Sequence, residues 1–259
     1  MAVEQPMEGG VSGAVRVGGT VHRPTGAWSP AVHALLRHLE GKGFDGAPRV
    51  LGTDEADREI LTYIPGETVL SANSWTSAVA RDELLYGVGR LICRYHDAVR
   101  DFRPPPGTVW RSRRGGAGPG EVICHNDLAP RNAICRETTA AAFIDWDFAA
   151  PHPADWDVAH AAWQFVPLQQ DELCLRLGWA SPPDRRSRFR LFCEACGTES
   201  PAHLLTVVRA RIAASRDGIR RLAEAGEPAF VKLRSEGHDA DMDQTISFLG
   251  QIARELLTP

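Results

Sequence analysis

The chain has 259 residues, of which 43% are hydrophobic and 24% are charged, and its formal net charge is −4. This length is enough for one large globular domain or for two smaller lobes that share a cleft. The weak negative charge gives no general attraction to nucleic acids or membranes, so we expect neither as a partner. No apolar run reaches transmembrane length and residues 1–10 do not resemble a signal peptide, which predicts a cytoplasmic protein.

Residues 1–67 are predicted to form a small β-rich lobe with one helix. The predicted strands are residues 13–19, 20–24, 47–52 and 58–67. The first two are alternating β-branched runs separated by glycines, which favours a hairpin. Residues 29–44 have apolar side chains on one face and predict a helix, with Ser29 as its N-cap and Gly41 near its end.

From residue 68 the pattern becomes helical, and residues 79–99 carry apolar side chains at helical spacing. Three or four further helices are predicted after residue 155. Their expected breaks are residues 181–184, 197–201 and 225–228. We therefore predict an α+β fold, with a β-rich N-terminal lobe (residues 1–67) and a mainly helical C-terminal lobe (residues 68–259).

The cysteines fit the reduced and mostly buried thiols of a cytoplasmic protein. They are Cys93, Cys124, Cys135, Cys174, Cys193 and Cys196. Cys193 and Cys196 have the C-x-x-C spacing of many zinc sites, but a structural zinc site needs a second ligand pair, which the sequence does not show. A zinc-binding module is therefore the weaker hypothesis, and core-facing helical cysteines are the better interpretation.

Polar residues gather in the segment "HNDLAPRN" (residues 125–132) and again in "FIDWD" (residues 143–147). Pro130 prevents a regular helix between Asp127 and Asn132, so a loop can turn both side chains toward one point. Asp145 ends a short apolar run, and a hairpin would bring it beside that loop. Each residue alone is typical of a turn, but together they provide the carboxylate and the Mg²⁺ ligands that phosphoryl transfer needs.

The two segments together resemble the catalytic and metal-binding motifs of the aminoglycoside phosphotransferase family, which is related to the protein kinases. Protein kinases have the pattern H-R-D-x-x-x-x-N followed by D-F-G. The resemblance implies a protein-kinase-like fold of two lobes. It also implies Mg²⁺-dependent transfer of the γ-phosphoryl group of ATP or GTP to a hydroxyl of an aminoglycoside-like or other small acceptor.

The resemblance also implies roles for single residues in the C-terminal lobe. Asp127 would be the catalytic base, and Asn132 and Asp145 would ligate Mg²⁺. His125 and Asp157 would support the loop structurally. Asp147 lies two residues after Asp145, faces the same way on an extended backbone, and would contact the metal or the substrate.

In the N-terminal lobe, the resemblance implies that the glycine-rich residues 8–14 cover the nucleotide phosphates, with the backbone N–H groups near Ser12 and Gly13 facing them. Residues 61–67 would form the hinge. Pro65 has no N–H group, so the carbonyl of Thr62 and the amide of Ile64 would contact the adenine.

The chain departs from the family where a lysine should bind the phosphates. Residues 20–24 offer His22 and Arg23 instead, and alternation favours Arg23, although a register shift of one residue would select His22. The partner glutamate is also missing. Glu40 lies too near the end of its helix, and the expected region holds Val32 and His33.

The loss of this pair leaves two hypotheses open. The first is an active kinase with a modified phosphate grip, which is favoured because Asp127, Asn132 and Asp145 are all present. The second is a pseudokinase that acts as a nucleotide- or protein-binding regulatory or immunity protein.

The last hundred residues should shape the acceptor site, but they carry opposite signals. An acidic cluster would suit a polycationic aminoglycoside or would be a solvated helix start. It contains Glu236, Asp239, Asp241 and Asp243. Five arginines would form a solvated helix face or meet an anionic partner. They are Arg209, Arg211, Arg216, Arg220 and Arg221.

Overall fold

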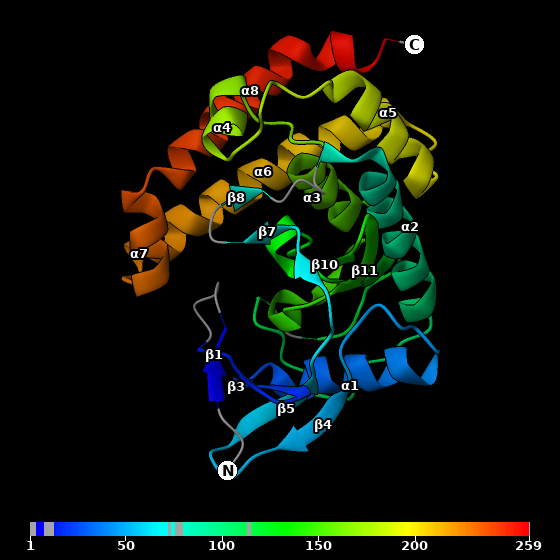
Figure 1. Cartoon of the computed structure of the whole chain (residues 1–259), viewed down its shortest axis with the longest axis vertical. Coiled ribbons are helices and arrows are strands. Elements are labelled where there is room, and N and C mark those ends of the chain that lie inside the picture. The colour runs from blue at the N-terminus through cyan, green and yellow to red at the C-terminus, as the bar shows by residue number, and fades with distance from the viewer. Residues whose placement is uncertain (1–3, 8–12, 72–73, 76–79, 113–114, 259) are drawn as a thin grey trace.

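The computed structural model describes residues 4–7, 13–71, 74–75, 80–112 and 115–258, and Figure 1 shows the course of the chain. A small β-rich lobe holds the N-terminal part of the chain, and a larger, mostly helical lobe holds the rest. This arrangement confirms the predicted α+β fold class.

The small lobe is built on a five-stranded antiparallel sheet in the order β1-β2-β3-β5-β4. Its strands are β1 (Glu4–Pro6), β2 (Val15–Val17), β3 (Thr20–Pro24), β4 (Val50–Thr53) and β5 (Arg58–Thr62). The turn between β2 and β3 falls at Gly18, whose φ of +60° is one that glycine adopts at little cost. The four predicted strands are confirmed. The sequence did not predict β1, which has three exposed residues and no apolar alternation.

Helix α1 (Ser29–Gly41) packs on this sheet through its apolar face. Its buried hydrophobic residues are Ala31, Val32, Leu35, Leu36 and Leu39. The prediction of Ser29 as the N-cap is wrong by one residue. The backbone of Trp28 is already helical, and the Ser29 hydroxyl instead accepts a hydrogen bond from the Gly26 N–H at 2.9 Å.

The larger lobe contains helix α2 and six later helices among the described residues, against the three or four predicted. They are α2 (Asp82–Val99), α3 (Asp155–Phe165), α4 (Asp171–Arg176), α5 (Arg185–Cys196), α6 (Pro201–Glu224), α7 (Pro228–Ser235) and α8 (His238–Leu256). The undercount comes from α4 and α7, which are too short for a clear helical period. None of the helices in the described ranges is long and apolar enough to cross a membrane.

Short strands in the larger lobe carry the two polar segments, residues 125–132 and 143–147. A three-stranded sheet has the order β11-β10-β6, and two further strand pairs are β9 with β12 and β7 with β8. The strands are β6 (Glu67–Thr68), β7 (Leu70–Ser71), β8 (Ser74–Trp75), β9 (Glu121–Cys124), β10 (Ala133–Arg136), β11 (Thr139–Phe143) and β12 (Ala150–Pro153). The lobe boundary expected between residues 67 and 68 therefore falls inside β6.

Candidate active site

The segment of residues 125–132 leaves β9 at Cys124 and is held by the carboxylate of Asp157 at the start of α3. One oxygen of Asp157 accepts the backbone N–H of His125 at 2.7 Å, and the other accepts that of Asn126 at 2.8 Å. Asn126 has a φ of +64°, a left-handed conformation that asparagine tolerates better than most residues. Two strong backbone bonds to one buried carboxylate therefore fix how the chain enters the loop.

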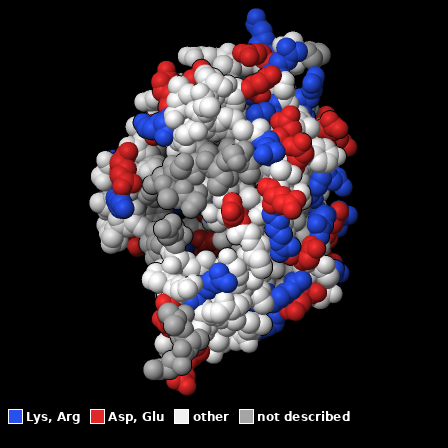
Figure 2. Space-filling view, in the orientation of Figure 1, with Lys and Arg blue, Asp and Glu red and all other residues white. Residues whose placement is uncertain are grey.

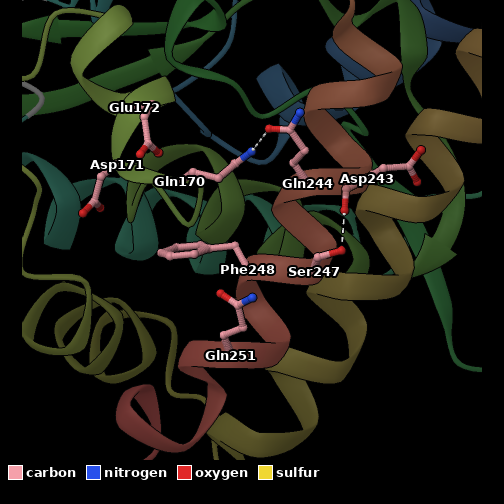
Figure 3. Close-up of a pocket in the computed structure, with 8 residues that line it drawn as sticks. All are labelled: Gln170, Asp171, Glu172, Asp243, Gln244, Ser247, Phe248 and Gln251. Carbon is pink, nitrogen blue, oxygen red and sulfur yellow. Dashed lines mark hydrogen bonds between the residues drawn. The ribbon is translucent and has the colours of Figure 1, made fainter.

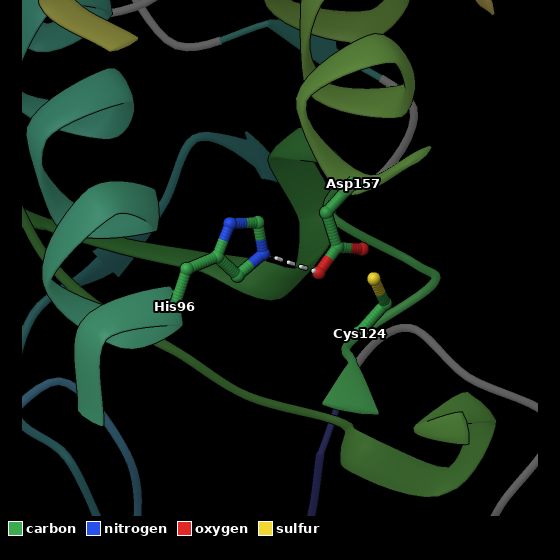
Figure 4. Close-up of side chains that lie close together, drawn as sticks. All are labelled: His96, Cys124 and Asp157. Atoms are coloured by element: carbon green, nitrogen blue, oxygen red, sulfur yellow. Dashed lines mark hydrogen bonds and ion pairs between the residues drawn. The ribbon is translucent and has the colours of Figure 1, made fainter. Parts of the chain in front are cut away.

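Behind this carboxylate lie two more potential metal ligands, His96 on α2 and Cys124 at the end of β9 (Figure 4). One ligand atom from each of the three residues lies within 4.8 Å of the others. The Cys124 thiol donates weakly to the carbonyls of His152 and Pro153, and burial raises the pKa of that thiol well above its usual value. His96 and the backbone N–H groups of His125 and Asn126 all bond to Asp157, so this carboxylate braces the loop.

The charge state of Asp157 follows from its bonds. Burial alone would raise its pKa, but the His96 ring, 3.2 Å away, and the backbone N–H groups lower the pKa below its usual value. His125 is also fully buried, and burial lowers the pKa of its imidazole. Its Nε2 lies 3.1 Å from the carbonyl oxygen of Ile144. Because His125 bonds to the residue before Asp145, it ties the loop to the end of β11.

Asp127 and Asn132 contact each other directly within the loop. The side-chain amide of Asn132 donates to Oδ2 of Asp127 at 2.8 Å and to its carbonyl oxygen at 2.9 Å. Because the amide nitrogen is used in this way, the side-chain oxygen of Asn132 is the atom left for a cation. Arg131 contacts Oδ1 of Asp127 at 3.1 Å, but its own side chain is mostly exposed.

Asp145 reaches the same corner because β10 and β11 form a hairpin. The N–H of Ile144 donates to the carbonyl oxygen of Asn132 at 2.9 Å, which places Asp145 next to the loop. Asp145 has a φ of +61° and a side chain that is 37% exposed. A left-handed aspartate costs free energy and is often found at functional sites. The three residues expected to carry the chemistry are thus brought together.

From the small lobe, Arg23 on β3 reaches this corner. Its guanidinium pairs with Glu59 through Nε, with Asp145 through Nη1 at 2.9 Å, and with Asp147 through Nη2. Burial would lower the pKa of Arg23, but the three carboxylates raise it. His22 lies on the opposite face of the strand, where Nδ1 is 2.8 Å from a carboxylate oxygen of Asp54. Of the two candidates, Arg23 is therefore the one beside the site.

Sequence reasoning missed Glu59, whose side chain is almost completely buried. It lies directly opposite Arg23 in the antiparallel register of β3 and β5. Its Oε1 accepts from Arg23, and its Oε2 pairs with Nε2 of His33 on α1 at 2.5 Å. Burial would raise the pKa of Glu59, but the hydrogen bond from His33 and the charge of Arg23 lower it. The one available signal was the cross-strand register, since opposed residues have neighbouring side chains.

Asp147 is occupied by arginines on both carboxylate oxygens. Oδ1 pairs with Arg23 and Oδ2 lies 3.4 Å from Nη1 of Arg111. Burial raises the pKa of Asp147, with Arg23 opposing the shift. Arg111, which was not predicted from the sequence, stacks its guanidinium 4.6 Å from the ring centres of both Trp28 and Phe148. Asp147 therefore joins the two lobes through ion pairs.

Of the residues expected to contact the nucleotide, the structure describes Gly13, Arg23, Thr62 and Ile64. Ser12 falls outside the described residues. Gly13 precedes β2 with a φ of +60°. Thr62 ends β5 and Ile64 follows in an irregular segment. Figure 2 shows a hollow in this face of the molecule, between the lobes, with acidic atoms visible inside it.

His160 on α3 lies beside Asp127, with its Nε2 3.8 Å from Oδ1 of Asp127. Both ring nitrogens are buried and have no hydrogen-bond partner among the described residues. Burial, with the charges of Arg211 and Arg131, lowers the pKa of His160 well below its usual value. Arg211 donates to the carbonyl oxygen of Asn126 at 2.7 Å. His160 was not predicted from the sequence, and Arg211 was predicted only as one of a series of arginines.

The acidic cluster near the C-terminus is largely neutralised by arginines. Its ion pairs are Asp239–Arg220 (2.8 Å), Asp241–Arg176 (2.7 Å), Asp243–Arg216 (2.7 Å) and Asp243–Arg220 (2.5 Å). A cavity of about 530 Å³ opens between the start of α4 and α8, and Asp243 of the cluster lines it together with Asp171 and Glu172 (Figure 3). It contains none of the residues of the 125–132 segment. The three aspartates of the cluster are thus paired with arginines, whereas Glu236 lies 3.8 Å from Nζ of Lys232.

Comparison with known proteins gives the fold and the family. Residues 108–188 match the family model described as "Phosphotransferase enzyme family". The trifolitoxin immunity protein of Rhizobium leguminosarum bv. trifolii is 39% identical over 193 residues, which are 73% of this chain and 72% of that protein.

Two solved structures resemble nearly the whole chain. The GDP complex of aminoglycoside 2'-phosphotransferase-IIIa has a TM-score of 0.62 at 13% identity and matches 95% of this chain and 92% of its own. A choline kinase from Cryptosporidium parvum Iowa II has a TM-score of 0.64 at 11% identity and matches 99% and 91%. These likenesses show a protein-kinase-like fold. The chain therefore belongs to the phosphotransferase enzyme family, also called the APH family.

Proposed function

We propose that the protein is a kinase that transfers the γ-phosphoryl group of ATP or GTP to a hydroxyl group of a small molecule, with Mg²⁺ as cofactor. The observation that carries this proposal is the meeting of Asp127, Asn132 and Asp145 at one corner of the inter-lobe region. In phosphoryl transfer, catalysis comes from positioning and from neutralising charge.

In the proposed mechanism Asp127 orients the acceptor hydroxyl and accepts its proton. The amide of Asn132 holds one oxygen of Asp127 at 2.8 Å, so the carboxylate keeps one orientation. The backbone bonds from His125 and Asn126 to Asp157 keep the loop itself in place. A carboxylate fixed in this way loses little entropy when the acceptor binds.

The residues present fit a magnesium ion. Mg²⁺ prefers carboxylate and amide oxygens; the side-chain oxygen of Asn132 is left free by its amide contacts, and the side chain of Asp145 is partly exposed. We propose these two residues as its ligands. When bound, the ion would neutralise charge on the phosphates. A contact of Asp147 with the metal or the substrate stays a prediction, because both of its carboxylate oxygens pair with arginines, Arg23 and Arg111.

The nucleotide is proposed to lie between the lobes. The aminoglycoside 2'-phosphotransferase-IIIa structure is a complex with GDP, which supports a nucleotide co-substrate for this fold. We assign the phosphates to Ser12, Gly13 and Arg23, and the base to the backbone of Thr62 and Ile64. Competition between Mg·ATP and Mg·GTP in a thermal-shift titration will distinguish the two nucleotides.

The acceptor is proposed to be an antimicrobial small molecule with a free hydroxyl group. The relative at 39% identity is named an immunity protein, which supports a protective role. Aminoglycoside-like compounds lead the candidates because a structural relative acts on that class by name. The paired acidic cluster does not favour a polycation, so amino alcohols and other hydroxylated compounds belong in the same acceptor panel.

The test is nucleotide turnover by the wild type and by Asp127→Asn, with and without each acceptor. We expect the variant to lose a factor of about 10²–10⁴ in kcat, the range for a positioned general base, and to keep its affinity for Mg·nucleotide. Asp155→Asn, at a partly exposed position on the same helix as Asp157, is the control and should turn over as the wild type does. Equal turnover by Asp127→Asn on every acceptor would rule out the catalytic proposal.

A second candidate function is protection by binding alone, as in a pseudokinase. The observation that favours it is the engagement of Arg23 with three carboxylates, which occupy the guanidinium nitrogens that a phosphate would need. Expression in a toxin-sensitive host distinguishes the two functions. A binding protein would protect the host equally well with Asp127→Asn, whereas a kinase would not.

A further inference from the structure

Arg23 links the two lobes because it forms ion pairs with carboxylates in both of them. Its Nε pairs with Glu59 inside the small lobe, whereas Nη1 and Nη2 pair with Asp145 and Asp147 in the larger lobe. Each nitrogen of the guanidinium therefore contacts a different carboxylate. One end of Arg23 is held within its own sheet, and the other end reaches across the site.

The anchor on Glu59 is a rigid one. Glu59 lies opposite Arg23 in the register of two paired strands, so the sheet fixes the distance between them. Its second oxygen is held by His33 from α1 at 2.5 Å. Both oxygens of a nearly completely buried carboxylate are thus in use, and the side chain is not free to swing away.

The contacts on the other end involve groups that a nucleotide complex would need. Asp145 is a proposed metal ligand, and guanidinium nitrogens bind phosphate as well as carboxylate. The guanidinium supplies a positive charge to two neighbouring carboxylates, of which Asp147 is mostly buried and Asp145 is partly exposed. A buried carboxylate without a counter-charge is costly.

We propose that Glu59, braced by His33, is a positioning residue that holds Arg23 by Nε, so that Nη1 and Nη2 neutralise Asp145 and Asp147 until a nucleotide binds. This inference rests on the proposed function, because it assigns those two nitrogens to the phosphates afterwards. It also accounts for the missing lysine and glutamate of the family. Arg23 takes the place of the lysine, Glu59 on β5 supplies the carboxylate that holds the guanidinium, and α1 contributes His33.

A direct consequence concerns divalent cations in the absence of nucleotide. Since Arg23 and a metal ion would share Asp145, the wild type should bind Mn²⁺ weakly when no nucleotide is present. Removal of the guanidinium should free the carboxylates. We expect Arg23→Met to bind Mn²⁺ at least about tenfold more tightly than the wild type, as expected for loss of a nearby like charge.

The experiment is a Mn²⁺ titration of the full-length, nucleotide-free protein, followed by electron paramagnetic resonance of the free ion. Arg23→Met combined with Asp145→Asn should lose the gain, which locates the new site. Arg58→Met is the matched control, because Arg58 also pairs with two carboxylates, Glu4 and Asp54, but on the outer part of the same sheet. It should leave Mn²⁺ affinity unchanged.

Arg23→Met removes the arginine partner of the buried carboxylate of Glu59, which lowers the stability of the protein. A second variant is therefore needed. Arg23→Met with Glu59→Gln removes both charges of the buried pair and should fold, with Asp145 freed to bind Mn²⁺ and Asp147 still paired with Arg111. A gain in affinity in either variant, abolished by Asp145→Asn, supports the proposal. If the folded double variant binds Mn²⁺ no better than the wild type, Arg23 does not occupy the place of the cation and the proposal is wrong.

This test separates the inference from the proposed function. Mn²⁺ binding without nucleotide requires no acceptor and no turnover. An inactive protein that shows the expected gain would refute the kinase proposal and leave the role of Arg23 as a counter-ion intact. An active kinase without the gain would refute only the inference.

Discussion

On the larger-lobe side of the site, the backbone N–H groups of His125 and Asn126 bind one buried carboxylate, Asp157, which holds the segment of residues 125–132. On the small-lobe side, the corresponding work is done by side chains alone, with Arg23 bound to Glu59 and Glu59 bound to His33. Backbone contacts constrain the loop whatever its other side chains are. A contact between side chains can be made by a residue from any neighbouring element. In this chain the glutamate that pairs with Arg23 is Glu59, which lies on β5 and not on α1.

The largest loss of stability is expected when the contacts of Asp157 with residues 125–132 are removed. Asp157→Ala removes the acceptor of two backbone N–H groups and leaves His96 without its partner. We expect the free energy of unfolding to fall by about 3–5 kcal/mol, the usual cost of breaking a buried charged network, with loss of turnover. Urea denaturation measures it.

The control for that change is Asp155→Asn, two residues earlier on the same helix. Asp155 is partly exposed and pairs with His203 at 3.0 Å. Its replacement should change the free energy of unfolding by less than about 0.5 kcal/mol. A loss from Asp157→Ala no larger than that from Asp155→Asn would show that the loop does not depend on the buried carboxylate.

The small-lobe side should respond in substrate affinity. Glu59→Gln keeps the shape of the side chain but loses the charged anchor for Arg23. We expect the KM for Mg·nucleotide to rise about tenfold, equivalent to one charge-assisted hydrogen bond, with the acceptor KM unchanged. Steady-state kinetics with each substrate varied in turn will measure both constants. A matched rise in both KM values, or the same rise in Asp54→Asn on the other face of the sheet, would contradict the positioning role.

Measuring the free energy of unfolding as a function of pH tests the role of His160, whose ring lies beside Asp127. The pKa of buried His160 is lowered in the folded protein, so the unfolded chain takes up the proton first as pH falls. Neutral His160 therefore contributes stability above pH ~6.5, and this contribution is lost as pH falls below that value, by at most about 1.4 kcal/mol per pH unit. His160→Gln should make the unfolding free energy less dependent on pH between 7 and 5.5.

The wild type, measured over the same pH range, is the comparison for this series. If His160→Gln and the wild type lose stability in parallel, the imidazole is not held neutral beside Asp127.

The smallest effect is expected in the acidic cluster. Asp241→Asn breaks one exposed pair with Arg176, and exposed ion pairs contribute about 0–1 kcal/mol. The unfolding free energy should change by less than about 0.5 kcal/mol, and the acceptor KM should not change. A severalfold rise in the KM of a cationic acceptor would show that the cluster takes part in acceptor binding.

The difference between the two sides also decides what could be predicted from sequence. Asp127, Asn132 and Asp145 were predictable as a group because a loop and a hairpin of fixed lengths bring them together. Glu59 was not, because its place opposite Arg23 depends on the register of two strands, and a shift of one residue would have put His22 there instead.

Other features depended on tertiary contacts that no local pattern encodes. His160 is one turn after Asp157 on α3, but only the packing of that helix shows that its ring faces Asp127. The acidic cluster looked like a candidate for binding a cationic acceptor until the arginines of α6 were found to pair with it. Whether an acidic residue is free or paired thus depends on long side chains from helices that are distant in the sequence.

The proposed activity is tested most directly by mass spectrometry of an acceptor panel incubated with Mg·ATP or Mg·GTP and either wild-type protein or Asp127→Asn. The account predicts that the wild type adds one phosphoryl group to a hydroxyl of at least one acceptor, and that Asp127→Asn, with unchanged nucleotide affinity, slows this addition by about 10²–10⁴. Equal addition by the two proteins, or a wild type that protects a toxin-sensitive host while leaving the toxin unmodified, would contradict it.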